Sequence, residues 1–153
     1  MRFKDRVVVI TGGAQGLGEG FARRFASEGA TLVLIDLQPD KCAQTARQLQ
    51  EQFGQPVTAL SANVADHDGM LQVAQRIQQQ LGRIDIWVNN AGIYRGTSTE
   101  SLSMDEWQLM LNVNYTGVFV CIKAVAPIMK AQGYGRIVNL SSIAGRTGFR
   151  DSM

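Results

Sequence analysis

The chain has 153 residues, of which 45% are hydrophobic and 18% are charged, and its formal net charge is +2. This length suits one domain with a buried core, and the lack of a basic excess argues against a nucleic-acid-binding protein. We find no run of about eighteen apolar residues and no signal-peptide pattern at the N-terminus. We therefore expect a cytoplasmic protein without a membrane partner.

The residues that could bind a metal or form a disulfide are few and scattered. Cys42 and Cys121 lie on separate predicted helices, and we expect both to be reduced thiols. The single histidine, His67, has no partner at a metal-ligand spacing and is expected to be solvated in the first turn of a helix. The sequence therefore predicts no metal site.

A glycine-rich turn from Thr11 to Gly18 follows the first predicted strand, which runs from Arg6 to Ile10. That strand is apolar and mostly β-branched, as is typical of a strand buried on both faces. After the turn Leu17, Phe21 and Phe25 recur at a spacing of four, which predicts a helix that packs these side chains against the sheet. Free N–H groups at such a helix start favour an anion, so the turn predicts a pyrophosphate site.

Strands and helices alternate along the next part of the chain. The pattern predicts strands over 31–35, 56–61 and 84–88, with helices over about 39–53 and 66–81 between them. Because each crossover has about the length of one helix, the strands are expected to be parallel and joined by right-handed connections. We therefore predict an α/β fold with a Rossmann-type doubly wound parallel sheet.

An irregular segment follows the fourth predicted strand. Ser103 and Glu106 then have the spacing of a capping box at the start of a helix. This helix is expected to run to about Gln132, with an interruption near residues 112–114. A fifth strand is predicted over 135–140.

Polar or small residues follow every predicted strand. They are the glycine turn, Asp36, residues 61–64, residues 89–92, and Ser141 with Ser142. Loops are polar in most proteins, which is the simpler explanation, but ligands of doubly wound sheets bind beyond the carboxyl ends of the strands. The recurrence at five successive strand ends favours a binding site.

These motifs resemble those of the short-chain dehydrogenase/reductase family. The glycine turn has the spacing T-G-x-x-x-G-x-G, the fourth strand ends in N-N-A-G, and N-V-N-Y-T-G lies in the long helix. The resemblance extends from about Lys4 to the last residue and implies hydride transfer between a nicotinamide cofactor and a secondary alcohol or ketone. By this resemblance the catalytic residues would be Ser142 and Asn114, and the cofactor-binding residues would be Gly12, Gln15, Gly16, Leu17, Gly18, Asp36, Leu37, Asn63, Val64, Asn90, Ala91 and Gly92.

Charge at the end of the second strand favours NAD over NADP. Asp36 stands where an acidic side chain can accept hydrogen bonds from both ribose hydroxyls of NAD, and it would repel a 2′-phosphate. NADP-preferring relatives often carry arginine inside the glycine turn, where this chain has Gln15. An arginine at position 23, 24 or 47 could accommodate NADP only by an unusual fold-back.

The resemblance also implies a Tyr-x-x-x-Lys motif after Ser142, and this sequence does not contain one. Tyr94, Tyr115 and Tyr134 each lack a lysine four residues later. We therefore expect residues 1–153 to form a single dinucleotide-binding domain whose sheet is incomplete at its C-terminal side. The chain is then the N-terminal part of a dehydrogenase, a non-catalytic NAD-binding fragment or interaction module, or a scaffold for another reaction such as epimerisation or dehydration.

The substrate remains open at this stage. Ile93, Tyr94 and the loop from Ala144 to Phe149 would border its site and are compatible with a secondary alcohol, a sugar alcohol, a steroid or an acyl-thioester ketone. A polyol or secondary-alcohol dehydrogenase fits NAD better than a 3-oxoacyl-thioester reductase does, because those relatives usually favour NADPH.

The helix from about Tyr115 to Lys130 predicts self-association. It carries Val118, Phe119 and Ile122 on one side and has an apolar surface wide enough for a partner helix as well as the sheet. The resemblance implies the same helix as an oligomer contact, so we expect a homo-oligomer, either a dimer or a tetramer.

Overall fold

The computed structural model describes residues 1–96 and 98–147. They form a five-stranded parallel sheet in the order β3-β2-β1-β4-β5. The strands are β1 (Val7–Thr11), β2 (Thr31–Asp36), β3 (Val57–Ser61), β4 (Ile86–Asn89) and β5 (Arg136–Asn139). The chain changes direction across the sheet between β3 and β4, so β1 is central and the predicted doubly wound order is confirmed.

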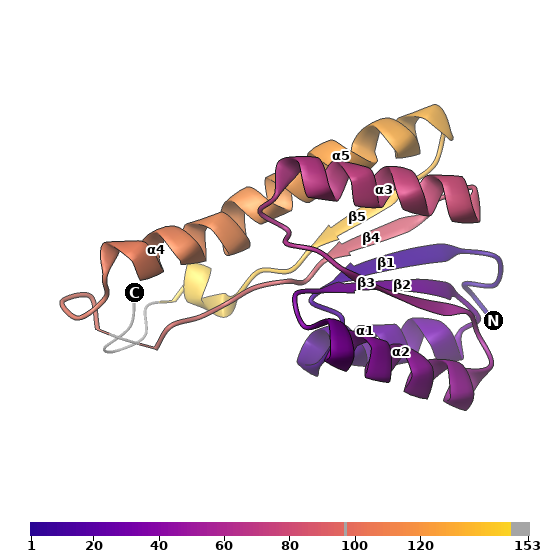
Figure 1. The fold of residues 1–153 in the computed structure, drawn as a ribbon, viewed down its shortest axis with the longest axis horizontal. Coiled ribbons are helices and arrows are strands. Elements are labelled where there is room, and N and C mark those ends of the chain that lie inside the picture. The colour runs from indigo at the N-terminus through magenta and orange to yellow at the C-terminus, as the bar shows by residue number, and fades with distance from the viewer. Residues whose placement is uncertain (97, 148–153) are drawn as a thin grey trace.

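Helices cover both faces of this sheet (Figure 1). Figure 1 shows α1 (Gly16–Ser27) and α2 (Pro39–Phe53) below it, and α3 (His67–Leu81) and α5 (Gly117–Ala131) above it. Local signals define their ends: Asp66 caps α3 by accepting from the Gly69 N–H at 3.1 Å. Comparison of these bounds with the sequence pattern shows that every predicted helix and strand is present, with ends shifted by a residue or two.

Each face of the sheet has its own hydrophobic cluster, because side chains alternate along a strand. The strand residues buried beneath α1 and α2 include Val8, Ile10, Leu32 and Leu34. Those buried beneath α3 and α5 include Val7, Val9, Val33 and Ile35. The parallel register aligns each set, since Val8 pairs with Leu32 and Val9 with Val33. This double burial explains why both strands are continuously apolar.

The face of α1 that packs on the sheet differs from the prediction. Leu17 is 70% exposed, and Phe21 and Phe25 are only partly buried at the edge of the cluster. The buried residues of the helix lie one position further along the chain: Gly18, Ala22 and Ala26. Small residues on this face let the helix approach the strands closely, and the larger side chains are displaced to its flanks.

The second half of the chain contains one long helix of mixed geometry. It begins with α4 (Met104–Leu111), passes through a π-helical turn η1 (Asn112–Thr116) and continues as α5. The predicted capping box is confirmed, because the Ser103 side chain accepts from the Glu106 N–H and the Glu106 carboxylate accepts from the Ser103 N–H. The predicted interruption is therefore a widened turn rather than a break.

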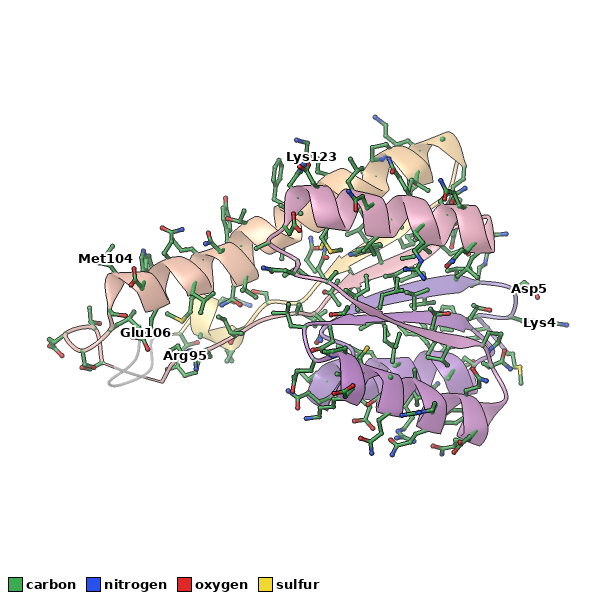
Figure 2. The ribbon with its side chains drawn as sticks, viewed as in Figure 1. Lys4, Asp5, Arg95, Met104, Glu106 and Lys123 are labelled. Atoms are coloured by element: carbon green, nitrogen blue, oxygen red, sulfur yellow. The ribbon has the colours of Figure 1, made fainter. Side chains whose placement is uncertain are left out.

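This helix also extends well past the sheet. Figure 2 shows Met104 and Glu106 on α4, beyond the strand ends. By length and composition alone, the helix from Met104 to Ala131 is apolar enough to cross a membrane. Packed core helices pass the same test, and α5 contributes Val120, Ala124 and Val125 to the hydrophobic cluster over β4. Packing on the sheet accounts for α5 only, because α4 has no buried residue and 33% of the helix's apolar window is buried.

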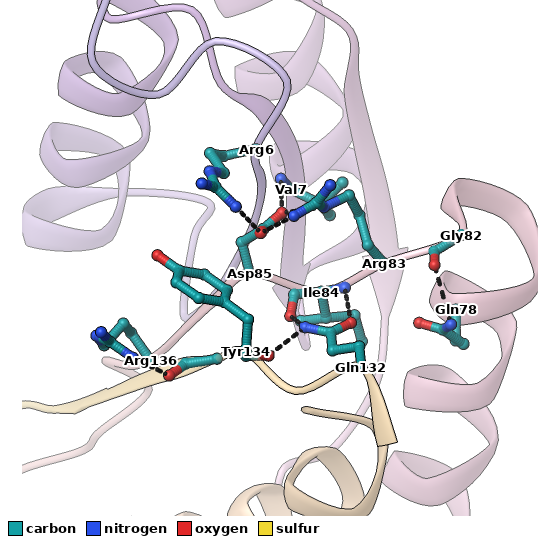
Figure 3. A network of polar contacts seen from close by, with 11 residues as sticks. Arg6, Val7, Gln78, Gly82, Arg83, Ile84, Asp85, Gln132, Tyr134 and Arg136 are labelled. Atoms are coloured by element: carbon teal, nitrogen blue, oxygen red, sulfur yellow. Dashed lines mark hydrogen bonds and ion pairs between the residues drawn. The ribbon is translucent and has the colours of Figure 1, made fainter. Parts of the chain in front are cut away.

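An ion cluster closes the amino end of the sheet (Figure 3). The fully buried Asp85 carboxylate accepts from Arg83 at 2.6 and 2.7 Å, from Arg6 at 2.8 Å and from the Val7 N–H at 2.9 Å. Burial alone would raise the pKa of Asp85, but the hydrogen bonds from Arg83, Val7 and Arg6 together lower it below its usual value. The Arg6 guanidinium also lies 4.7 Å from the ring centroid of Tyr134. This cluster joins β1, β4 and the turn before β5.

The sheet ends at β5 in the part of the chain that the structure describes. Val138 is 45% exposed, and the other β5 residues are exposed or half-buried. A shallow apolar groove runs between β5 and α5, lined by Phe119, Ile122 and Leu140 among others. In the described residues β5 is thus an exposed edge of the sheet.

Both cysteines are free and buried. Burial raises the pKa of Cys42 to about 11 and that of Cys121 to about 12. Thiols with such pKa values stay protonated and unreactive at neutral pH. Both cysteines pack in the hydrophobic clusters of the sheet, and their reduced state stays an expectation.

Candidate cofactor site

A cavity of about 380 Å³ opens at the carboxyl ends of β1 to β4. It is lined by segments that follow each of these strands, as expected at the point where strand order reverses. Ten of the twelve predicted cofactor residues line it: Gly12, Gln15, Leu17, Asp36, Leu37, Asn63, Val64, Asn90, Ala91 and Gly92. The structure therefore brings together residues that are up to 80 positions apart in the sequence.

The two remaining predicted residues, Gly16 and Gly18, shape the turn without lining the cavity. A Cβ atom on Gly18 would lie 2.0 Å from the Gly12 carbonyl oxygen and 2.7 Å from Asn90 Nδ2. Gly16 has open space around it but a φ of +59°, a conformation that residues with a Cβ rarely adopt. Gly18 thus permits close packing against Gly12, and Gly16 permits the bend of the turn.

The amino end of α1 faces this turn and provides unpaired donors. Its N-cap residue is Gln15, whose side chain makes no capping hydrogen bond. The first N–H groups of a helix have no acceptor within the helix, and together with the helix dipole they favour an anion. The turn is therefore suited to a phosphate or pyrophosphate group.

Asp36 at the end of β2 is held in one orientation by two backbone donors. Its Oδ2 accepts from the Ala14 N–H at 3.1 Å, and its Oδ1 accepts from the Gln38 N–H at 3.1 Å. A carboxylate has about four acceptor positions, so two remain for a ligand. Because Asp36 is half-buried and lines the cavity, those positions are available to hydroxyl donors.

A network around Thr11 connects the N-N-A-G segment to the glycine turn. The Thr11 Oγ1 atom accepts from the N–H groups of Asn90 and Ala91, each at 3.1 Å. The Asn90 side chain donates back to the carbonyls of Thr11 and Gly12, at 3.0 and 3.1 Å. The carboxamide of Asn90 therefore supports the glycine turn, and Asn90 also lines the cavity.

Asn114 lies in the π-helical turn and contacts the chain that leaves β4. Its Oδ1 accepts from the Ile93 N–H at 2.8 Å, and its Nδ2 donates to the Ile93 carbonyl at 2.7 Å. Asn114 does not line the cofactor cavity itself but borders the groove between α5 and β5. Its side chain thereby orients the segment that includes Gly92 and Ile93, both of which line the cavity.

Ser142 follows β5 and caps a short 3-10 helix, η2 (Ile143–Gly145). Its Oγ accepts from the Ala144 N–H at 3.2 Å, which leaves the hydroxyl proton available to another acceptor. Of the expected substrate-site residues, Ile93 lines the cavity and Tyr94 is 65% exposed. Phe149 lies outside the described residues.

The structure also places Lys41, which the sequence analysis missed, beside this site, although Lys41 does not line the cavity itself. The Lys41 ammonium, in the first turn of α2, donates a hydrogen bond to the Gln15 side-chain oxygen. Two of the three arginines considered as partners of NADP pair with other residues, Arg23 with Glu19 at 3.0 Å and Arg24 with Glu28 at 2.7 Å. The sequence did offer a signal for Lys41, because this residue follows the end of β2 at Asp36 by five positions and lies in the first turn of α2.

Comparisons with known proteins identify the architecture. A family described as short chain dehydrogenase matches residues 6–152. Meso-2,3-butanediol dehydrogenase from Serratia marcescens is 38% identical over 97% of this chain and 57% of its own length. Eight curated relatives are each covered over only 54–60% of their length.

Two solved structures of similar fold contain a dinucleotide cofactor. An NAD⁺-bound xylitol dehydrogenase superposes with a TM-score of 0.93 at 29% identity, covering 99% of this chain and 58% of the other. A metagenomic short-chain oxidoreductase in complex with NADP has a TM-score of 0.91 at 29% identity, covering 99% of this chain and 69% of the other. Solved relatives of similar fold therefore hold either dinucleotide.

Proposed function

Because the chain belongs to the short-chain dehydrogenase family, we propose that it forms the NAD-binding part of an oxidoreductase acting on a secondary alcohol or ketone. The observation that carries the proposal is Asp36, which lines the cavity with two acceptor positions left after binding the N–H groups of Ala14 and Gln38. Residues 1–153 would act as one dinucleotide-binding domain in the cytoplasm.

The described residues fit a dinucleotide. Because Gly18 has no Cβ, the helix start packs closely against the Gly12 carbonyl. The amino end of α1 offers N–H donors to a pyrophosphate. Leu17 and Leu37 stand on the cavity wall with 70% and 64% of their surface exposed. An adenine ring against such side chains would remove apolar surface from water, which favours binding.

NAD is favoured over NADP by charge. The free acceptor positions of Asp36 suit the two ribose hydroxyls, whereas a 2′-phosphate would bring like charges together in a half-buried site. Removing a hydrogen bond to a charged group costs about 1.5–3 kcal/mol, so Asp36 is expected to contribute at least about tenfold to NAD affinity.

When bound, the nicotinamide would supply hydride transfer. We assign Ser142 to hold the substrate oxygen through its free hydroxyl proton, and Asn114 to position the segment at Ile93. The alternative is a non-catalytic NAD-binding fragment or interaction module, because the sequence has no Tyr-x-x-x-Lys motif. A polyol or simple secondary alcohol is the proposed substrate class, in keeping with the NAD preference.

We also propose that the chain forms a homo-oligomer through α5. Phe119 on this helix is 63% exposed, and Tyr115 in the preceding turn η1 is 77% exposed, both next to the apolar groove beside β5. The face that packs on the sheet instead includes Val120 and Val125. Apolar residues on both sides of one helix are typical of a helix that packs in two directions.

Calorimetric titration with NAD and NADP tests the cofactor assignment. We expect NAD to bind more tightly, and Asp36→Asn to weaken NAD binding by at least about tenfold. Asp40→Asn, an exposed aspartate in the first turn of α2, is the matched control and should leave NAD affinity unchanged. Equal losses in both variants would contradict the proposed role of Asp36.

Intact mass and NADH absorbance on the same sample separate the two candidate functions. A mass above that of 153 residues, with NADH formed from NAD and a secondary alcohol, would support the dehydrogenase. A mass equal to that of this chain, with NAD bound and no turnover, would support the non-catalytic alternative.

A further inference from the structure

One cation, Lys41, contacts a lining residue of the cavity without lining the cavity itself, and this partner is neutral. The Lys41 ammonium donates to the Gln15 carboxamide oxygen, and Gln15 lines the cavity together with Asp36 and Leu37. Among residues 1–96 and 98–147, the ion pairs do not include Lys41. An exposed ammonium bonded to a neutral amide can exchange that partner for an anion at little cost.

Lys41 and Asp36 act on the same small region. Lys41 is in the first turn of α2, which begins three residues after Asp36. The neighbouring Cys42 responds to the Asp36 charge, because burial and then the charge of Asp36 raise its pKa. The first turn of α2 therefore lies within the field of the carboxylate that the ribose is proposed to contact.

We propose that Lys41 is a specificity-determining residue for the ribose 2′ position, where its ammonium leaves Gln15 and pairs with a 2′-phosphate. This inference rests on the proposed NAD site. Asp36 favours an unsubstituted ribose, while Lys41 offsets part of the repulsion that a 2′-phosphate meets. The site consequently accepts both dinucleotides, with NAD bound more tightly and NADP bound measurably.

The flexibility of the lysine side chain makes this exchange feasible. Its four-carbon stem carries a compact charge with three donors, so the ammonium can move without disturbing α2. The Gln15 carboxamide has no capping bond to α1 to lose when Lys41 departs. Arg23 and Arg24 are engaged with Glu19 and Glu28, so Lys41 is better placed than either of these two arginines.

The test is the ratio of NADP to NAD affinity, measured by calorimetric titration of the whole chain with each dinucleotide. In Lys41→Gln we expect NADP binding to weaken about tenfold and NAD binding to change less than about twofold. Arg47→Gln, which removes an exposed cation from the same helix, is the matched control and should not alter the ratio. Raising the salt concentration should shrink the effect of Lys41→Gln, because a charge pair at the surface is screened.

A double variant refines the assignment. Asp36→Asn should increase NADP affinity relative to NAD, and adding Lys41→Gln should cancel most of that increase. If Lys41→Gln weakens both dinucleotides equally, the lysine only positions Gln15 and the inference fails. Wild-type protein that binds NAD but no NADP also overturns it.

Failure of the underlying NAD site has a different signature. Protein that binds neither dinucleotide, or whose NAD affinity is the same with Asp36→Asn, contradicts the proposed function itself. An unchanged NADP-to-NAD ratio in Lys41→Gln, with NAD binding and its dependence on Asp36 intact, contradicts only the role of Lys41.

Discussion

Asp85 and Asp36 lie at opposite ends of the same parallel sheet and use their oxygens differently. Asp85, at the amino end, is fully buried and bonded to Arg6, Arg83 and the Val7 N–H. Asp36, at the carboxyl end, is half-buried, and within the described residues its side chain is bonded to two backbone N–H groups. The first carboxylate has its charge neutralised within the protein, whereas the second keeps charge and acceptor positions for a ligand.

This difference shows how one fold separates stability from binding. Buried ions need partners on all sides, because an unpaired charge in the interior is costly. The amino end can meet that need, since chain segments from β1, β4 and the turn before β5 converge there (Figure 3). The carboxyl end instead holds the cavity, and its donors and acceptors are only partly used. Variants at the two ends should therefore have separable effects.

The largest expected effect is at the glycine turn of the carboxyl end. Gly18→Ala would place a Cβ 2.0 Å from the Gly12 carbonyl oxygen, so the backbone must move. We expect a loss of about 3 kcal/mol or more in the free energy of unfolding, together with loss of NAD binding. Chemical denaturation and calorimetric titration measure the two effects.

Gly20→Ala in the same helix is the control for this clash. A Cβ on Gly20 meets no atom within 4 Å, and alanine is favoured over glycine inside helices by about 1 kcal/mol. We expect this variant to be as stable as the wild type or more so, with NAD affinity unchanged. Equal destabilisation by both alanines would show that the close approach at Gly18 is not the cause.

At the amino end, Asp85→Asn should destabilise the fold without altering cofactor binding. The amide keeps the shape but loses the charge that pairs with Arg6 and Arg83, and we expect a cost of about 2–3 kcal/mol in the free energy of unfolding. Asp5→Asn, an exposed change near the same end, should stay within about 0.5 kcal/mol, since asparagine tolerates its positive φ. An NAD affinity altered in folded Asp85→Asn protein would contradict the separation of the two ends.

The stabilising effect of Asp85 should also depend on pH. Because the pKa of Asp85 is lowered in the folded state, its contribution is full at neutral pH, begins to fall below about pH 5 and is lost as the pH drops through the folded pKa. The stability gap between wild type and Asp85→Asn should therefore shrink on acidification. Urea denaturation at pH 7, 5 and 4 measures the gap, and a constant gap would mean that the carboxylate charge is not its source.

The smallest expected effect concerns the link between β1 and β4 at the carboxyl end. Thr11→Val removes the acceptor of the Asn90 and Ala91 N–H groups, and we expect a loss of about 1–2 kcal/mol in unfolding free energy and weaker NAD binding. Thr58→Val, an exposed position in β3, should change neither quantity. Thr11→Val protein that binds NAD as well as the wild type does would show that this network serves stability alone.

Local signals in the sequence were sufficient for most of the fold. The capping residues Ser103 and Asp66 and the apolar runs of β1 and β2 act within a few neighbouring positions, so they can be recognised without tertiary information. The motifs also predicted most of the residues that line the cavity, because the carboxyl ends of parallel strands meet at one edge. Their roles in binding and catalysis stay predictions.

What periodicity alone predicted poorly was the choice between neighbouring faces of a helix. Leu17, Phe21 and Phe25 have the spacing of a buried stripe, yet α1 buries its small residues because Gly18 must approach the Gly12 carbonyl. A hydrophobic pattern indicates which side chains avoid water. Which face of the helix packs against the sheet depends instead on how closely the two backbone segments approach. That distance is a property of the assembled sheet.

The sequence by itself thus determined the order of strands and helices, the glycine turn and the acidic residue at the end of β2, since each depends on residues close in the chain. Only the tertiary structure decided that Asp85 meets Arg6 from 79 positions away and that Lys41 reaches Gln15 from 26 positions away. The physical reason is that polar contacts between residues far apart in the chain depend on which strands and helices become neighbours. Which strands become neighbours in the sheet is settled by packing of the whole sheet, not by any local segment.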